Sequence, residues 1–345
     1  MESLRSPVDA VVLWVDGSDP LHREKLDNYL ATLGHYPAAA HPTRFAETGE
    51  FEFCIASILR FLPWIRKIYI VTDNQTPAFM SMVRTSPNSE RITIVDHKII
   101  FRDYEEFLPT FNSRSLTTML WRIPGLSEQF IYMNDDILFL RPVARTEFFR
   151  ENKIVIGGSW HIQHSHRADV RLRKLLNISS GRYSDKSEER PGNRAGQAKG
   201  AEVAGYRKRY FRLRHSPHPQ LRSLYEDFFT VNPEVLRNNI SYPLRSSYQF
   251  LPEALLVHLA LLNSKAVIEQ NLSTIMLKME KISVPCLRTR LMATDKTDRF
   301  ACACIQSLDQ AGPRKRGIII EWMERRIGRL ADNLHREYLP EYTGL

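Results

Sequence analysis

Long apolar runs alternate with amphipathic segments along the first part of the chain. The runs are rich in β-branched residues and lie at 8–15, 68–72, 92–96 and 130–133. Runs of this kind are typical of strands buried on both faces of a parallel sheet. Segments 50–62 and 113–122, which lie between them, have helical spacing. The alternation predicts an α/β fold with a mostly parallel sheet and helices on both faces.

The later part of the chain has a different pattern, in which helical segments predominate. Helical spacing occurs at 221–229, 252–262 and 316–338. The last segment places its apolar side chains on one stripe, formed by Ile319, Met323, Ile327, Leu330, Leu334 and Tyr338. We predict that residues 312–345 form an amphipathic helix packed on the preceding domain. Contact with a membrane surface or a partner is the alternative.

Polar or acidic residues directly follow each predicted strand. They are Asp16, Asp73-Asn74, Asp96-His97 and Asn134-Asp135-Asp136. Ligands of open α/β sheets bind beyond the carboxyl ends of the strands, so we expect these side chains to converge on one pocket. The alternative is that they cap helices and turns, as Asp and Asn commonly do. For the adjacent pair Asp135 and Asp136 we favour a functional role.

Composition and charge narrow the class of protein. With 345 residues, 43% of them hydrophobic and 25% charged, the chain is expected to fold into one large domain. The net charge of +9 favours an anionic partner. Much of this charge lies in a Gly- and Ser-rich stretch, where we predict a mobile basic insertion at 167–210. The insertion is interpreted either as a solvated loop or as a surface for a nucleotide, an anionic polymer or acidic lipid.

The sequence favours a cytoplasmic protein. No apolar run has the roughly 18 residues that a membrane-spanning helix needs. Only seven residues precede the first apolar run, so we expect no secretory leader. The four cysteines are interpreted as free thiols rather than a disulfide framework.

Several residue types could carry phosphate chemistry. An Asp-Asp pair after a strand can hold Mg²⁺ or Mn²⁺ against a nucleotide diphosphate, because hard cations prefer oxygen ligands. His215 and His218 are candidate bases, and Arg245 is a candidate phosphate clamp. The sequence has no P-loop, no GxGxxG fingerprint and no GxSxG elbow, which argues against P-loop, dinucleotide and hydrolase chemistry.

Taken together, these segments resemble the Stealth family of sugar-1-phosphate transferases. The resemblance begins with Trp14-Val15-Asp16-Gly17-Ser18-Asp19-Pro20 and continues through 44–77, 108–113, 121–128 and 130–136. Two further segments, 214–245 and 300–309, resemble the later motifs of the family. The likeness covers roughly residues 8–311, so we predict a Stealth-type nucleotide-sugar phosphotransferase domain over 1–311.

The resemblance implies a GT-A-like (Rossmann-like) fold, a divalent metal (Mg²⁺ or Mn²⁺) and a specific reaction. A glycan or capsule-polymer hydroxyl attacks the sugar-linked phosphorus of a donor such as UDP-GlcNAc, a nucleoside monophosphate leaves and a phosphodiester forms. The implied catalytic residues are Asp136, His218 and Arg245, and the implied metal ligands are Asp135, Asp136 and Asp309. The implied donor- and substrate-binding residues are Asp16, Gly17, Ser18, Asp19, Arg44, Asn74, Gln75, Asn112, Ser113, Arg122, Asn134 and His215. A peripheral contact with the inner face of the cytoplasmic membrane or with capsule-assembly machinery would fit this role.

The chain departs from the family pattern at one helix. Many relatives carry a glutamate where this chain has Thr117, and a histidine where it has Trp121. If the glutamate is the base in those relatives, another group must take its place here. Two alternative functions remain at this stage: a metal-dependent glycosyltransferase that releases a nucleoside diphosphate, and a polyanion-binding module without turnover. The second would need basic residues interleaved with exposed aromatic side chains, so we expect no nucleic-acid partner.

Overall fold

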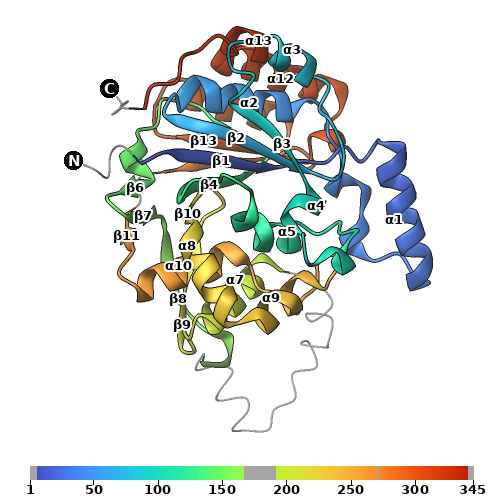
Figure 1. Cartoon of the computed structure of the whole chain (residues 1–345). Helices are drawn as coiled ribbons and strands as arrows, with labels where there is room; N and C mark the ends of the chain where they lie inside the picture. The colour runs from blue at the N-terminus through green and yellow to red at the C-terminus, as the bar shows by residue number, and fades with distance from the viewer. Residues whose placement is uncertain (1–5, 167–191, 270–271, 341–345) are drawn as a thin grey trace, which may run out of the picture.

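A five-stranded sheet forms the centre of the protein (Figure 1). The computed structural model describes residues 6–166, 192–269 and 272–340. The strand order is β10-β4-β1-β2-β3. Strands β1 (Val8–Leu13), β2 (Ile65–Thr72), β3 (Ile92–Asp96) and β4 (Gln129–Asn134) are parallel, and β10 (His218–Leu221) is antiparallel to β4. The predicted α/β fold with a mostly parallel sheet is therefore confirmed.

Helices cover both faces of this sheet (Figure 1). One face is covered by α2 (Glu50–Phe61), with α3 (Met80–Arg84), α12 (Pro313–Ile327) and α13 (Leu330–Asn333) nearby. The other face carries α4 (His97–Ile100), α5 (Ser113–Met119), α8 (Arg222–Val231), α9 (Pro233–Ile240) and α10 (Pro252–Leu262). Two further long helices are α1 (Pro20–Leu33) and α11 (Val284–Asp295).

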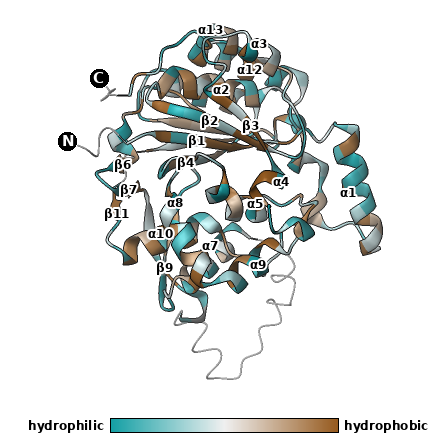
Figure 2. Cartoon of the chain, viewed as in Figure 1, coloured by the Kyte–Doolittle hydropathy of each residue, from teal (hydrophilic) through white to brown (hydrophobic). Residues whose placement is uncertain are grey.

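The core consists of the central strands and the helices packed on them. Val11, Val12 and Ile70 are fully buried, as is Ile55 of α2. Removing such surfaces from water stabilises the fold by roughly 25 cal/mol per Å² of apolar area. In Figure 2 the hydrophobic colour is concentrated on the central sheet, whereas α1 is mostly hydrophilic and buries only His22 and Leu26.

Three smaller sheets extend the fold beyond the central strands. The first contains β12 (Thr274–Lys278), β13 (Cys302–Gln306) and β5 (Ile137–Phe139), and its register places Cys304 opposite Ile137. The second contains β11 (Ala266–Ile268), β7 (Lys153–Ile156) and β6 (Phe149–Arg150). The third pairs β8 (Gly158–Ile162) with β9 (Arg209–Leu213).

The predicted mobile basic insertion at 167–210 differs from the structure where it is described. Residues 167–191 lie outside the described residues, but 193–203 form helix α7 (Asn193–Val203) rather than a loop. The helix packs so closely on α10 that a Cβ atom at Gly200 would come within 2.9 Å of the Leu251 carbonyl oxygen. Glycine thus permits a helix in a segment whose composition indicated a loop.

The predicted C-terminal helix is shorter than the apolar stripe indicated. Helix α12 ends at Ile327, because Gly328 adopts a φ of 80°, which breaks the helix. Ile319, Trp322, Met323 and Ile327 are buried, and the helix packs on α2 and α11. The apolar face of α12 is therefore covered by protein.

Candidate active site

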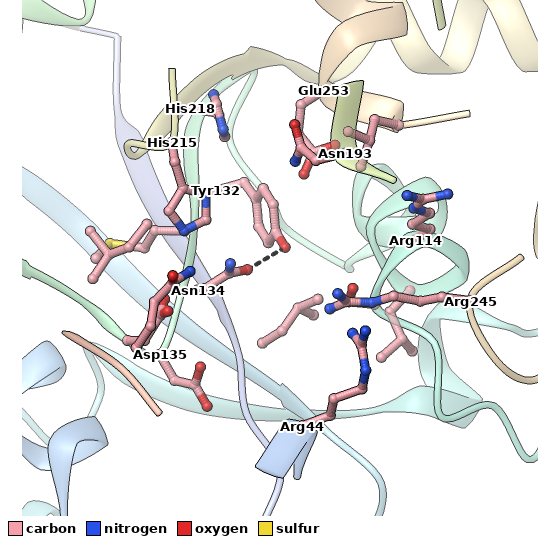
Figure 3. Close-up of a pocket in the computed structure, with 18 of the residues that line it drawn as sticks. Arg44, Arg114, Tyr132, Asn134, Asp135, Asn193, His215, His218, Arg245 and Glu253 are labelled. Atoms are coloured by element: carbon pink, nitrogen blue, oxygen red, sulfur yellow. Dashed lines mark hydrogen bonds between the residues drawn. The ribbon is translucent and has the colours of Figure 1, made fainter. Parts of the chain in front are cut away.

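A cavity of about 1190 Å³ opens beyond the carboxyl ends of β1 and β4. The residues labelled in Figure 3 line this cavity and come from both halves of the chain. Of the predicted site residues, the cavity lining includes Arg44, Ser113, Asn134, Asp135, Asp136, His215, His218, Arg245 and Asp309. Strand ends and a distant loop thus converge as the sheet topology predicted.

Two carboxyl groups lie where β4 ends. Asp135 and Asp136 form the turn between β4 and β5. Burial raises the pKa of Asp135 well above its ordinary value, and the neighbouring charge of Asp136 raises it further. Burial also raises the pKa of Asp136, although His215 and a hydrogen bond from Cys304 partly offset this. A carboxylate with raised proton affinity is suited to accept a proton near neutral pH.

Three arginine side chains line the same cavity and lie across it from Asp135 (Figure 3). Arg44 is the last residue of a short 3₁₀ helix (Pro42–Arg44), Arg114 lies on α5 and Arg245 lies in the segment between α9 and α10. Burial lowers the pKa of all three, and that of Arg114 falls to about 10. Arg245 also lowers the pKa of Arg44 and Arg114 through charge repulsion. All three remain cationic at pH 7, so a bound anion would relieve their mutual repulsion.

Glu253 and Tyr132 also line the cavity, and Tyr132 lies beside Asn134, between it and Arg245 (Figure 3). Glu253 is near the start of α10, and its Oε2 atom is buried without a hydrogen-bond partner among the described residues. Burial raises the pKa of Glu253, with the two arginines partly offsetting this effect. The Tyr132 hydroxyl donates to Asn134 Oδ1 at 2.8 Å.

Three residues that line the cavity, Arg114, Tyr132 and Glu253, were not predicted from the sequence, and neither was the contact of Cys304 with Asp136. A signal existed for Glu253, which interrupts the apolar run 251–262, because a carboxylate inside such a run needs a reason to be buried. For Arg114, the adjacent Asn112 and Ser113 were singled out but the arginine was not. Nothing in the spacing of Tyr132 or Cys304 indicated the cavity.

The two candidate bases of the histidine pair differ in their surroundings. His218 lies on β10, opposite Tyr132 in the register of the sheet. Burial, together with the charge of His215, lowers the pKa of His218 to about 3. His218 is therefore neutral at pH 7 and a weak base. His215 lies on the cavity wall, and its Nε2 atom is buried without a hydrogen-bond partner in the described part of the chain.

The metal ligands predicted from the resemblance do not come together as an all-oxygen set. Among residues 6–166, 192–269 and 272–340, one group of metal-binding side chains is found, and it comprises Asp136, His215 and Cys304. Asp309 lines the cavity elsewhere, with its backbone oxygen accepting a hydrogen bond from Arg316. A set that includes nitrogen and sulfur does not fit Mg²⁺, which requires oxygen ligands in octahedral geometry.

The motif Asp16–Asp19 serves local structure and does not contribute to the cavity lining. Asp19 caps α1 by accepting a hydrogen bond from the His22 backbone at 2.9 Å. Asp16 Oδ1 accepts from the Ser18 backbone at 2.8 Å, and its backbone oxygen accepts from Gln75. Gly17 is needed because a Cβ atom there would come within 2.6 Å of Phe45. The donor-binding roles of Asp16, Gly17, Ser18 and Asp19 remain predictions.

Four other predicted donor-binding residues also form structural contacts away from the lining. Asn74 adopts a φ of 53° in the turn after β2, and Gln75 connects this turn to Asp16. Asn112 caps α5 and donates to the Tyr242 backbone oxygen. Arg122 donates to two backbone carbonyls and lies 3.3 Å from Asp103. Asn, Gln and Arg are frequent at such positions, so their presence in a motif does not indicate substrate contact by itself.

The residue that departs from the family pattern is also structural. Thr117 is buried on α5, where its hydroxyl donates to the Ser113 backbone oxygen at 2.7 Å. Trp121 packs against Phe229 with ring centroids 6.5 Å apart. Neither residue lines the cavity. On this side of the cavity, Glu253 supplies the carboxyl group.

Two family models match the N-terminal part of the chain. Residues 6–34 match Stealth protein CR1, conserved region 1, and residues 44–156 match Stealth protein CR2, conserved region 2. The chain belongs to the Stealth family. The matched regions of this Stealth protein include Arg44, Arg114, Asp135 and Asp136. The resemblance of 214–245 and 300–309 to later family motifs stays a prediction, because the family matches end at residue 156.

Curated relatives of this Stealth protein are phosphotransferases by name. An exopolysaccharide phosphotransferase of Streptomyces coelicolor is 35% identical over 251 residues, which are 69% of this chain and 24% of the relative. Two capsular polysaccharide phosphotransferases, from Actinobacillus suis and Actinobacillus pleuropneumoniae, are each 40% identical, over 44% and 51% of this chain and 40% and 46% of the relatives. The matched part thus spans less than half the length of each of these relatives.

Solved glycosyltransferase structures have a distantly similar arrangement. The galactosyltransferase LgtC, in complex with donor and acceptor sugar analogs, has a TM-score of 0.40 at 12% identity and covers 94% of this chain and 95% of its own. Mouse xyloside xylosyltransferase 1 has a TM-score of 0.38 at 9% identity, covering 86% and 97%. TM-scores of this size do not establish a shared fold, so the fold is assigned from the order and direction of the strands. No helix in the described residues is long and apolar enough to span a membrane.

Proposed function

We propose that this Stealth protein transfers a sugar-1-phosphate from a nucleotide-sugar, such as UDP-GlcNAc, to a hydroxyl group of a capsular or exopolysaccharide glycan. The products are a phosphodiester and a nucleoside monophosphate. The observation that carries the proposal is that Arg44, Arg114 and Arg245 line one cavity together with Asp135 and Asp136, with the arginines across from Asp135. The names of the relatives support the reaction class.

Arg44 and Arg245 are proposed to bind the pyrophosphate of the donor, and Arg114, whose guanidinium donates to the backbone oxygens of Ser246 and Gly192, adds positive charge beside them. A guanidinium group can donate two parallel hydrogen bonds to phosphate oxygens, and such charge-assisted bonds are stronger than neutral ones. No hydrogen bond joins the Arg245 side chain to another described residue, so its donors are available to a ligand. Phosphoryl transfer places charge on the oxygens of the attacked phosphorus, and preorganised cations stabilise that charge.

The pair Asp135 and Asp136 is proposed to receive the proton of the attacking hydroxyl group. Their raised pKa values bring proton affinity closer to that needed near neutral pH. His218 is a weaker candidate, because its pKa of about 3 leaves little driving force to take a proton. We assign it a positioning role beside His215.

Glu253 is proposed to accept a hydrogen bond from a hydroxyl group of the sugar. Its Oε2 atom is buried without a partner in the described residues, although the side chain lines the cavity. A buried polar atom without a partner costs about 1–3 kcal/mol. A substrate hydroxyl would remove this cost on binding, so Glu253 contributes to affinity and orientation.

The expected Mg²⁺ or Mn²⁺ is not used in any step of this mechanism. The side chains that meet at Asp136 include a thiol and an imidazole, which do not fit Mg²⁺. The remaining expectations, contact with an inner membrane face or with capsule-assembly machinery, stay predictions, because they were based on charge and the family resemblance.

The nucleotide product tests the proposed function. We would incubate the full chain with a panel of nucleotide-sugars and a glycan acceptor and separate the released nucleotides by chromatography. Sugar-1-phosphate transfer releases UMP from UDP-GlcNAc, whereas transfer of the sugar alone releases UDP. An Asp136→Asn variant is the matched control, since contaminating hydrolases would be unaffected by it. Release of UDP in an Asp136-dependent manner would contradict the proposal.

A further inference from the structure

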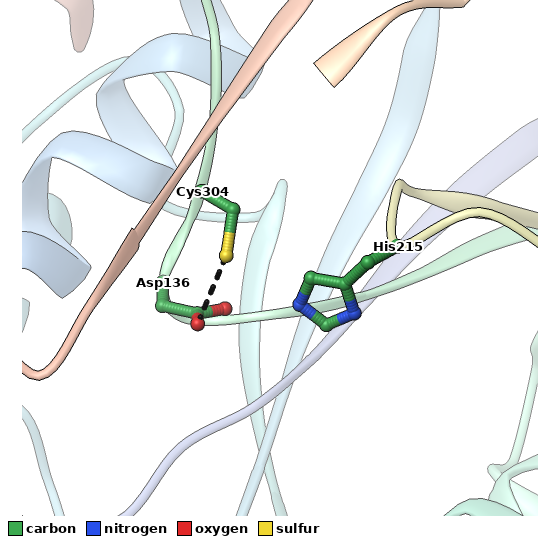
Figure 4. A group of neighbouring side chains, drawn as sticks. All are labelled: Asp136, His215 and Cys304. Atoms are coloured by element: carbon green, nitrogen blue, oxygen red, sulfur yellow. Dashed lines mark hydrogen bonds between the residues drawn. The ribbon is translucent and has the colours of Figure 1, made fainter. Parts of the chain in front are cut away.

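Three metal-binding side chains from distant parts of the chain meet beside the cavity: Asp136 and His215 line it, and Cys304 is buried next to Asp136 (Figure 4). Asp136 lies in the turn between β4 and β5, His215 precedes β10 and Cys304 lies on β13. One ligand atom of each side chain lies within 4.8 Å of the ligand atoms of the other two. The antiparallel pairing of β13 with β5 brings Cys304 to Asp136, whose backbone oxygen accepts from the Ile305 backbone at 2.9 Å.

Two of the ligand-bearing groups have buried atoms without a partner. Asp136 Oδ1 and His215 Nε2 are both buried and have no hydrogen-bond partner within the described ranges. Native structures leave few such atoms, so two at one place call for a ligand. The Cys304 thiol donates to the other Asp136 oxygen at 3.2 Å. In a tetrahedral zinc site the same two ligand atoms would be about 3.5 Å apart, so little rearrangement is needed.

We propose that Asp136, His215 and Cys304 bind one divalent transition-metal ion of the zinc class, in preference to Mg²⁺. Thiolate and imidazole ligands select such ions, whereas Mg²⁺ requires oxygen ligands. Three protein ligands would leave room for a fourth ligand, as in catalytic zinc sites, and two of the three residues line the cavity. On binding, the metal–sulfur bond forms as the S–H bond breaks, and the proton passes to solvent. Asp135 then remains as the carboxyl group that can take a proton.

The chain contains a matched control for the thiol. Cys302 lies two residues before Cys304 on β13 and is equally buried, but it is not part of the metal-binding group. The charged groups that affect its pKa are Arg141 and Glu147, not Asp136. Substitution of Cys302 therefore tests the effect of removing a buried thiol from the strand without removing a proposed ligand.

Cobalt binding is the test, because Co²⁺ replaces Zn²⁺ in such sites and is coloured. The full chain, freed of metal and kept reduced under anaerobic conditions, is titrated with Co²⁺. We expect one equivalent to bind, with a sulfur-to-cobalt charge-transfer band in the near ultraviolet. The band persists in Cys302→Ser and disappears in Cys304→Ser, and excess Mg²⁺ does not displace the ion. Absence of the band, or its persistence in Cys304→Ser, would overturn the proposal.

A second variant covers the case in which Cys304→Ser fails to fold. His215 is half-buried in a loop, so His215→Gln is expected to fold, as circular dichroism would verify. Loss of groups that merely support a ligand typically costs 10–100-fold in metal affinity, so loss of a ligand should weaken Co²⁺ binding by at least about 100-fold. Unchanged affinity in His215→Gln would also overturn the proposal. Neither readout uses a nucleotide-sugar, so the result is independent of the proposed transferase activity.

Discussion

Two acidic segments follow neighbouring parallel strands, yet they have different roles in the structure. After β1, Asp16 and Asp19 accept hydrogen bonds from nearby backbone groups, in a turn and at the start of α1. After β4, Asp135 and Asp136 line the cavity, and Asp136 Oδ1 has no hydrogen-bond partner in the described residues. The two segments begin on adjacent strands, since β1 pairs with β4.

The difference shows how to tell a capping carboxylate from a reactive one. A cap is recognised by the backbone donors that its oxygens accept, and these donors stabilise the charged form. A reactive carboxylate is buried beside a cavity with few donors, so its proton affinity rises. Position after a strand is common to both, and it is the hydrogen-bond partners that separate them.

Asp136→Asn should abolish most of the activity without unfolding the protein. The substitution keeps the shape of the side chain but removes its ability to accept a proton or bind a cation. We expect kcat/KM for nucleotide-sugar turnover to fall roughly 10³-fold, as is typical when a general acid–base group is lost. The thermal midpoint should not decrease, because a buried charge is removed. Turnover close to that of the unmodified protein would contradict the role of the pair.

Arg245→Lys should lower kcat/KM by about 10²-fold, the loss typical for one preorganised donor to a developing charge. Lysine keeps the positive charge but cannot donate two parallel hydrogen bonds. The matched control is Arg122→Lys, because Arg122 is also in the family motifs but binds backbone carbonyls away from the cavity. Equal losses of activity per folded molecule in the two variants would contradict a phosphate-binding role for Arg245.

Glu253→Gln should separate activity from stability. We expect kcat/KM to fall about 10-fold, which corresponds to about 1.4 kcal/mol. The free energy of unfolding at pH 7 should rise, because the folded protein no longer holds a carboxylate whose pKa burial has raised. This gain should disappear as the pH falls below the ordinary pKa of 4.5, where the carboxyl group is protonated in both states. Urea titrations at pH 7 and pH 4 measure it, and an equal gain at both values would contradict the assignment.

Asp19→Ala should have the opposite signature and the smallest effect on turnover. Loss of the α1 cap should lower the free energy of unfolding by about 1 kcal/mol, whereas turnover per folded molecule stays unchanged. Asp19→Ser, which retains a capping oxygen, should restore most of the stability. If Asp19→Ala instead reduces kcat/KM as strongly as Asp136→Asn, the contrast between the two segments is wrong.

Much of the fold was predictable, because buried strands and helix faces require apolar residues at regular positions in the sequence. Strands over 68–72 and 92–96 were found within β2 and β3, since strands buried on both faces are almost wholly apolar. The helix 193–203 was missed, because its glycines lower helix propensity and are explained only by the close packing of α10. The end of α12 was also missed, since an apolar stripe continues past Gly328.

Residues of the candidate site were predictable only where they directly follow a strand of the central sheet. Asp135 and Asp136 were found because the sheet topology places them at the carboxyl edge. Cys304 and Glu253 were not, because the contact of Cys304 with Asp136 depends on the register of β13 with β5, and the place of Glu253 in the cavity depends on how α10 packs. The same rule that found Asp135 also selected Asp16 and Asp19, whose hydrogen-bond partners are not visible in the sequence.

The fate of the sugar-linked phosphate tests the central claim most directly. UDP-GlcNAc labelled with ³²P at the phosphate next to the sugar is incubated with the full chain and a glycan acceptor, and the label is followed into the polymer fraction. We expect the label to enter the polymer and to resist phosphomonoesterase there, and we expect no labelled polymer with Asp136→Asn. Recovery of the label in UDP, with GlcNAc alone transferred to the acceptor, would contradict the claim.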